Sequence, residues 1–439
     1  MTGITRLVES RRFSDNRKNR GEKILNDQMV SIVIPCYKQA KLLTGAVRSC
    51  LDQTHPLLEI IVVDDGSPDD VKGALQPFGN RIKLIKQENQ GLAAARNTGL
   101  QAVNGKYVKF LDADDWLLPN CVEQQFKSLK GLSGYISVVG YRFHFDDSER
   151  KDEDVFPNFG KFSHALCYIN TGPPHTFLFP TEMVRNLGGF NTGSLVDGGH
   201  EDYELLCRLA SQGIEAAALH IIGCVYRQTK ASMSRQLGKM QRTRSGVWIS
   251  YAENLMKQDC SLDLLVHLIG GYVLRLKSDD FRYQATHILT LISEKISELE
   301  AVISQATAIL LSQKLTHLLK HLPSPDSLQD RKQRDLHLKI VENLTDKILL
   351  RITPDFFLEA DPLLSLIDLA NAHMEINRNR YGRKVLTHSL LISPPNFFLK
   401  SGLFLLKFLS FILPGKLAVS IWRCLRNVYE IFPLRFNLG

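Results

Sequence analysis

The chain has 439 residues, of which 44% are hydrophobic, and it carries a formal net charge of +8. This length and composition predict two or three folded units with sizeable cores. The positive charge slightly favours an anionic partner, and since no nucleic-acid-binding motif accompanies it, we expect no nucleic acid among the partners. The eight cysteines are scattered without a CxxC pair, and most lie in apolar runs, which is typical of reduced thiols in a cytoplasmic protein.

The first 28 residues are polar and net basic, and they contain no apolar stretch of the kind found in a secretory signal. We expect a disordered basic tail over 1–28 and a folded domain over 29–236.

Apolar strands alternate with helices in the first part of this domain. Proline cannot donate to a ladder, so Pro35 marks the end of the first strand. The alternation is typical of a mostly parallel α/β sheet with helices on both faces. The predicted strands are 30–35, 58–65, 81–88 and 105–111, and the predicted helices are 42–54 and 92–103.

Polar residues follow three of these strands, at Pro35–Tyr37, Asp64–Ser67 and Asp112–Asp115. Ligands of such sheets bind at the carboxyl ends of the strands, so the three segments are expected to line one crevice. Asp112 and Asp114 would point the same way on an extended chain, where their like charges repel unless a cation neutralises them. Carboxylates suit Mg²⁺ or Mn²⁺. The alternative is an acidic loop that caps a helix.

A second acidic site lies at His200-Glu201-Asp202, in the first turn of a predicted helix over 198–213. The acids could serve only to favour the helix dipole, or they could face the crevice. Arg208 is not on the face of Asp202 and is expected to be structural. The acceptor side is expected over 121–197, with strands at 135–147 and 175–180 and a short helix in 181–190 that ends on Gly188-Gly189. The loop 170–176 is expected to line the sugar pocket, with His175 as a candidate contact.

Helical periodicity replaces the strand pattern beyond residue 236, so an all-helical region is predicted over 237–399. The segment 400–439 contains six Lys or Arg residues against one acid, among Leu, Phe, Ile and Trp. Its apolar run is too short for the roughly 20 residues that span a bilayer. It suits the surface of an anionic membrane as a basic amphipathic helix pair. A buried helical hairpin is the alternative.

Five segments in this order resemble the family-2 glycosyltransferases over about residues 29–235. They are VSIVIPCYKQA, EIIVVDDGSPDD, NQGLAAARNTGL, GKYVKFLDADDW and GGHEDYELLCRLASQG. The resemblance implies the A-type nucleotide-sugar fold, a Rossmann-like sheet. It also implies an inverting, hexosyltransferase-type enzyme that takes a sugar from a nucleoside diphosphate sugar with Mn²⁺ or Mg²⁺ as cofactor.

The resemblance assigns roles residue by residue. Asp202 would be the general base, with Glu201 orienting the acceptor or the helix end. Asp114 would be the direct metal ligand, with Asp112 as ribose contact or additional ligand. Relatives often add a histidine ligand downstream, but none lies between Ile221 and Val247 here. The nucleotide-binding residues would be Pro35, Tyr37, Asp64, Asp65, Arg96 and Asp112, and the candidate diphosphate or acceptor contacts would be Arg227, Lys230 and His175.

Other functions are also consistent with parts of the sequence. A nucleotide-sugar-binding protein without turnover would not need all four of Asp65, Asp112, Asp114 and Asp202. A nucleotidyltransferase needs a glycine-rich loop after the first strand, and no glycine follows it before Gly45. The expected acceptor is a cell-surface polysaccharide or lipid-linked saccharide, with a protein acceptor as the alternative. The expected location is cytoplasmic and peripheral at the inner face of the cell membrane.

Overall fold

The computed structural model describes residues 28–146, 150–229, 237–276, 279–299, 303–322 and 328–351, and a few positions between 365 and 385. The predicted tail 400–439 and the predicted tail 1–28, apart from its last residue, lie outside this set.

The chain divides into two units, 1–251 and 252–439. The division lies within α9 (Leu237–Met256), further along the chain than the predicted boundary at residue 236. The reason is that α9 begins as part of the first unit. The indole nitrogen of Trp248 donates a hydrogen bond of 2.8 Å to the carbonyl of Cys167, and both side chains are buried.

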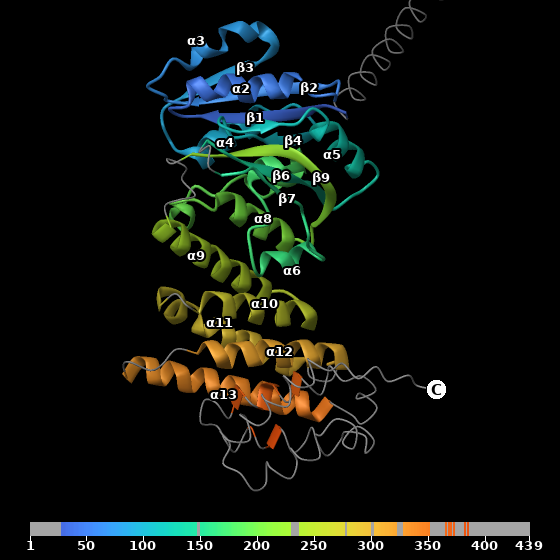
Figure 1. Cartoon of the computed structure of the whole chain (residues 1–439), viewed down its shortest axis with the longest axis vertical. Coiled ribbons are helices and arrows are strands. Elements are labelled where there is room, and N and C mark those ends of the chain that lie inside the picture. Colours follow the sequence, from blue (N-terminus) through green and yellow to red (C-terminus); the bar gives the residue numbers. More distant parts are fainter. Residues whose placement is uncertain are drawn as a thin grey trace, which may run out of the picture. The chain divides into compact units, whose positions relative to one another are not determined.

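The first half of the sheet in the first unit is parallel, with the strand order β3-β2-β1-β4 (Figure 1). All seven residues of β1 are buried, which explains its continuous apolar sequence. The strands are β1 (Val30–Cys36), β2 (Leu58–Asp65), β3 (Lys83–Gln87) and β4 (Tyr107–Phe110), and the connecting helices are α2 (Ala40–Leu51), α3 (Val71–Leu75), the 3₁₀ segment η1 (Gln76–Arg81) and α4 (Leu92–Ala102).

Strand β1 continues to Cys36, past the predicted end at Pro35. Its pairing with β4 ends at Val33 and Phe110, whereas its pairing with β2 continues. Beyond Val33 the strand therefore has a single neighbour, which is a position that proline tolerates because its missing N–H need not break a ladder bond.

The second half of the sheet is mixed. Strand β8 (Phe177–Pro180) is antiparallel to β4, and β6 (Tyr135–Phe145) is antiparallel to β8. Because both of these pairings are antiparallel, β6 runs in the same direction as β4. Strand β9 (Glu215–Gln228) is parallel to β6. The carboxyl ends of β1, β2, β4, β6 and β9 therefore lie at the same edge of the sheet.

Shorter elements complete the first unit. They are β5 (Trp116–Leu117), which pairs with β9; β7 (Glu153–Val155), which pairs with β6; α5 (Cys121–Leu129); α6 (Phe162–Leu166); η2 (Pro174–Thr176); α7 (Thr181–Asn186); η3 (Ser194–Val196); and α8 (Glu201–Ser211).

The helix predicted to end on Gly188-Gly189 ends at Asn186, because Gly188 and Gly189 take positive φ angles of 79° and 76° that break the helix. One predicted boundary in this region was wrong. His175, predicted on a strand, lies in the turn η2 before β8.

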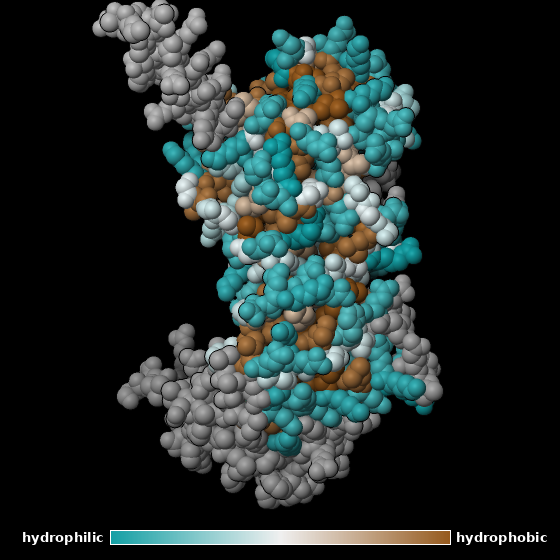
Figure 2. Space-filling view, turned by 180° about the vertical axis from the view of Figure 1, so that it is seen from behind, coloured by the Kyte–Doolittle hydropathy of each residue, from teal (hydrophilic) through white to brown (hydrophobic). Residues whose placement is uncertain are grey.

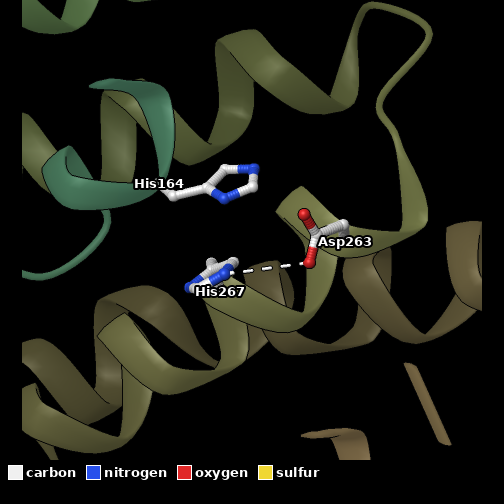
Figure 3. Close-up of side chains that lie close together, drawn as sticks. All are labelled: His164, Asp263 and His267. Carbon is white, nitrogen blue, oxygen red and sulfur yellow. Dashed lines mark ion pairs between the residues drawn. The ribbon is translucent and has the colours of Figure 1, made fainter. Parts of the chain in front are cut away.

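The described part of the second unit is helical, as predicted. Its buried positions include Leu265 and Ile269 on α10. Asp263 and His267, one turn apart on α10, form an ion pair with 3.8 Å between Oδ1 and Nε2 (Figure 3). The helices are α10 (Leu262–Arg275), α11 (Asp279–Glu298), α12 (Gln305–His321) and α13 (Leu328–Arg351).

Apolar residues on the face drawn in Figure 2 form patches that hydrophilic residues interrupt. Among the helices described, none is both long enough and apolar enough to cross a bilayer.

Candidate active site

The carboxylates at the end of β2 hold the neighbouring loops. Asp65 accepts hydrogen bonds of 2.9 Å from the backbone N–H groups of Gln90 and Gly91, at the start of α4. Asp64 accepts one of 2.8 Å from the N–H of Ser67. Both aspartates are buried, so these donors offset the cost of removing their charges from water.

The end of β1 forms the rim beside them. Pro35 is buried within the strand, whereas 41% of Tyr37 is exposed. The ammonium of Lys38 lies 4.9 Å from the centre of the Tyr37 ring. An exposed aromatic face at the carboxyl end of a central strand is suited to stacking on a planar base.

Arg96 joins two acidic segments that are distant in the sequence. Its guanidinium lies 2.6 Å from Oδ1 of Asp112, after β4, and 2.5 Å from Oε1 of Glu201, in the first turn of α8. The arginine is 1% exposed. Burial opposes its charge, but Asp112 and Glu201 raise the pKa of Arg96 above its usual range.

Asp115 is the most buried carboxylate of the Asp112–Asp115 segment, with 1% of the residue exposed. Its Oδ1 accepts a hydrogen bond of 2.8 Å from the N–H of Arg227, on β9. Its Oδ2 lies 3.0 Å from Nδ1 of His175. Burial disfavours a charged imidazole, but Asp115 raises the pKa of His175 to about 10. Burial also raises the pKa of Asp115, although the charge of His175 lowers it.

His175 is fully buried in this pair. The sequence suggested it as a direct diphosphate or acceptor contact, and the structure instead places it against the buried Asp115 of the acidic segment. One ligand atom each from Asp112, Asp115 and His175 lie within 4.8 Å of one another. Burial, together with the charges of Asp115 and Asp112, raises the pKa of Asp114 to about 7. Asp114, the predicted direct metal ligand, is not part of the group formed by Asp112, Asp115 and His175.

Asp202 lies in the first turn of α8, next to Glu201. Its Oδ1 accepts a hydrogen bond of 2.6 Å from the N–H of Tyr203, and its Oδ2 accepts one of 3.1 Å from the amide of Asn170. Burial and the charge of Glu201 raise the pKa of Asp202 to about 6, although Arg96 and the two hydrogen bonds lower it. The carboxylate can therefore take up a proton near neutral pH.

The other two candidate diphosphate or acceptor contacts are Arg227 and Lys230. Arg227 is half-buried, and its Nε lies 2.8 Å from Oδ1 of Asp146. Lys230 lies outside the described residues. Arg208 is structural, as predicted, because it contacts Glu204 at 2.7 Å and donates to the carbonyls of Leu187 and Gly189.

Three residues make contacts in the site that the sequence did not predict. Asp115 was noticed as part of the acidic run without a partner, and Asn170 lies in a loop that was assigned only to the sugar pocket. His200 has a left-handed φ of 69°, and its Nδ1 lies 3.0 Å from the hydroxyl of Thr243 on α9. Nothing in local sequence could pair it with a residue on α9.

An α/β sheet with acids at the ends of β2 and β4, joined by a buried arginine to an acidic helix, has the A-type glycosyltransferase fold. Residues 31–188 match the family model described as Glycosyl transferase family 2. The match supports the predicted family-2 glycosyltransferase for this part of the chain, which holds four of the five segments, whereas the fifth, 198–213, lies beyond it.

Relatives match the same part of the chain. The glycosyltransferase GlyA of Streptococcus pneumoniae serotype 4 is 37% identical over 129 residues, which are 29% of this chain and 18% of that protein. The glycosyltransferase GlyG of the same organism is 33% identical over 126 residues, 28% of this chain and 42% of that protein. The chain thus spans less than half of the length of each of these two relatives.

Solved structures resemble the chain over a longer range. The crystal structure of S. aureus TarS 1–349 in complex with UDP-GlcNAc aligns with 72% of this chain and 92% of that one, at 15% identity and a TM-score of 0.49.

Proposed function

We propose that the chain is an inverting glycosyltransferase that moves a hexose from a nucleoside diphosphate sugar to a hydroxyl group of an acceptor. The contact of Arg96 with both Asp112 and Glu201, at 2.6 and 2.5 Å, supports this proposal most strongly. It joins the edge that would hold the nucleotide to the helix that carries Asp202. A donor and an acceptor can therefore meet in one site.

The nucleotide would lie along the carboxyl ends of β1, β2 and β4. Tyr37 would stack on the base, and the backbone at Pro35 would lie beneath it. The loops fixed by Asp64 and Asp65 would bound the base and ribose, and Asp112 would contact the ribose. This assignment uses the exposed ring of Tyr37 and the buried, hydrogen-bonded state of the two aspartates.

We propose Mn²⁺ or Mg²⁺ as the cofactor, held by Asp114 with Asp112. The fit rests on the crowding of three carboxylates in one segment, where ligand atoms of Asp112, Asp115 and His175 lie within 4.8 Å of one another. Burial and the charges of Asp115 and Asp112 also raise the pKa of Asp114 to about 7, and a bound cation would favour its charged form. When bound, such an ion would neutralise the charge that develops on the leaving diphosphate.

Asp202 would remove the proton from the attacking hydroxyl. Its pKa of about 6 leaves it ionised and still basic at neutral pH. Glu201, held by Arg96, would fix the start of α8. A single displacement on the anomeric carbon, with one base and no covalent intermediate, inverts the configuration.

The acceptor would be a cell-surface polysaccharide or a lipid-linked saccharide, and the enzyme would work at the inner face of the membrane. The net charge of +8 and the basic, apolar sequence of 400–439 support an anionic surface as partner. Flotation with liposomes should then show binding that increases with anionic lipid and decreases with salt. Failure of the full chain to bind such liposomes would contradict this location.

The main experiment screens the purified protein against UDP-, GDP- and dTDP-sugars and measures donor hydrolysis with and without Mn²⁺. Hydrolysis of one class of donor, lost in Asp202→Asn while binding of the nucleoside diphosphate persists, would support the proposal. Binding without any hydrolysis or transfer would favour a nucleotide-sugar-binding protein instead.

A further inference from the structure

Aromatic side chains gather at the ends of two strands beyond the acidic segment. Tyr141, Phe143 and Phe145 alternate along β6, and Phe143 is paired in register with Tyr226 on β9. Alternate residues of a strand share one face, so these four rings form a continuous surface. We refer to Tyr141, Phe143, Phe145 and Tyr226 as the aromatic platform.

The rings contact one another directly. The centre of the Phe143 ring lies 5.1 Å from that of Tyr141, 5.5 Å from that of Tyr226 and 5.9 Å from that of Phe145. All four residues are half-buried, so part of the platform faces solvent. Tyr141 also packs against the hydrophobic core, and the other three rings continue this apolar surface toward the end of the sheet.

The platform adjoins the candidate active site. The ends of β6 and β9 lie at the same edge as the end of β4, which carries Asp112–Asp115. The Tyr226 ring lies 5.4 Å from that of His175, whose partner is Asp115. The next residue, Arg227, donates its N–H to the same aspartate. The acidic segment and the platform are therefore fixed to one another.

A cation lies beside the rings. The guanidinium of Arg150 lies 4.4 Å from the centre of the Phe145 ring. Arg142 and Arg227, the strand neighbours of the platform residues, lie on the opposite face of the sheet, because side chains alternate along a strand. Flat apolar rings with a hydrogen-bonding cation at one end match a pyranose, which has C–H groups on one face and hydroxyls around its rim.

We propose that the aromatic platform binds a saccharide portion of the acceptor, with a pyranose ring stacked on Phe143 and Tyr226. The negative face of an aromatic ring attracts the polarised C–H groups of a sugar. This inference rests on the proposed glycosyl transfer and adds to it the surface that would hold the saccharide acceptor.

The test measures binding of methyl glycosides of glucose, galactose, mannose and N-acetylglucosamine, by saturation-transfer NMR with UDP and Mn²⁺ present. We expect saturable binding of at least one glycoside, with transfer to its ring protons. Phe143→Ala should weaken this binding about tenfold, in keeping with the loss of a stacked ring. Phe143→Tyr keeps the aromatic face and should retain binding.

Phe156→Leu is the matched control, because Phe156 is an exposed aromatic residue that stacks on His220, outside the platform. It should leave glycoside binding unchanged. UDP binding is measured on every variant by calorimetry. It shows, independently of glycoside binding, whether the variant is folded and its donor site is intact.

The outcomes separate the two proposals. If UDP binds but no glycoside binds, or if glycoside binding is the same in Phe143→Ala and wild type, the platform is not an acceptor site. If wild-type protein binds no nucleoside diphosphate at all, the proposed glycosyl transfer fails first.

Discussion

Arg96 and Glu201 are 105 residues apart in the sequence, yet the guanidinium and the carboxylate lie 2.5 Å apart and both residues are buried. The other guanidinium nitrogen of Arg96 contacts Asp112 at 2.6 Å. One side chain thus fixes the distance between the acidic segment after β4 and the first turn of α8. Displacing it would disturb both halves of the proposed site.

We expect Arg96→Met to destabilise the first unit strongly. It leaves the carboxylates of Asp112 and Glu201 without their cation, and removal of one partner from a buried ion pair costs about 3–5 kcal/mol. Chemical denaturation followed by tryptophan fluorescence measures the effect. Arg142→Met, which breaks an exposed pair with Asp154, is the control and should cost less than about 1 kcal/mol. Equal losses in both variants would contradict the structural role of Arg96.

Asp202→Asn should reduce sugar transfer by about 10²–10⁴-fold, because the amide keeps the shape of the side chain but cannot accept a proton. Binding of the nucleoside diphosphate should be unchanged, since Asp202 contacts Asn170 and Tyr203 rather than the end of β4. Single-turnover kinetics and calorimetry measure the two quantities. Transfer at the wild-type rate would assign the base to another residue, with Glu201 as the next candidate.

The pH dependence of transfer should also follow Asp202. Only the carboxylate form accepts a proton, so kcat/KM should increase with pH and level off above a pKa of about 6. The wild-type profile is measured at saturating metal between pH 5 and pH 8. A profile that is flat from pH 5 upward would mean that the base titrates elsewhere.

The raised pKa of Asp202 has a consequence for stability. The Asp202 carboxyl binds its proton more tightly in the folded protein than in the unfolded chain. The free energy of unfolding therefore decreases as pH rises from the ordinary pKa of 3.8 to the folded-state pKa of about 6. The asparagine variant lacks this loss. The stability of Asp202→Asn relative to wild type should therefore increase between pH 4 and pH 7, measured as the difference in unfolding midpoint at each pH. A constant or decreasing difference would contradict the raised pKa.

The sequence predicted the parallel half of the sheet because its strands are continuous apolar runs that stop at polar residues. The family resemblance assigned Arg96 to the nucleotide site, but not to a contact with Asp112 or Glu201. The sequence could not predict the pairing of Asp115 with His175, because that contact depends on η2 and β8 arriving beside β4 from a distant part of the chain. The end of α7 could be predicted for a local reason, since Gly188 and Gly189 take positive φ angles that break a helix.

Asp114→Asn should abolish the dependence of nucleoside diphosphate binding on Mn²⁺. The carboxylate and the diphosphate would share the ion, so the wild type should bind UDP more tightly with Mn²⁺ than with EDTA, whereas the variant should bind equally weakly in both. Calorimetry with UDP measures this, and electron paramagnetic resonance of Mn²⁺ reports the ion itself. A wild type that is indifferent to EDTA would contradict the metal proposal.

His200 precedes the acidic pair Glu201-Asp202 with a left-handed φ of 69°, a conformation that costs a non-glycine residue about 1–2 kcal/mol. Glycine takes this conformation freely, and a β-branched residue takes it poorly. His200→Val should therefore be less stable than His200→Gly by about 1–2 kcal/mol, measured as the difference in the free energy of unfolding. Both variants lose the contact with Thr243, so that loss cancels in the comparison. If the valine variant is as stable as the glycine variant, the loop before α8 does not hold this conformation in solution.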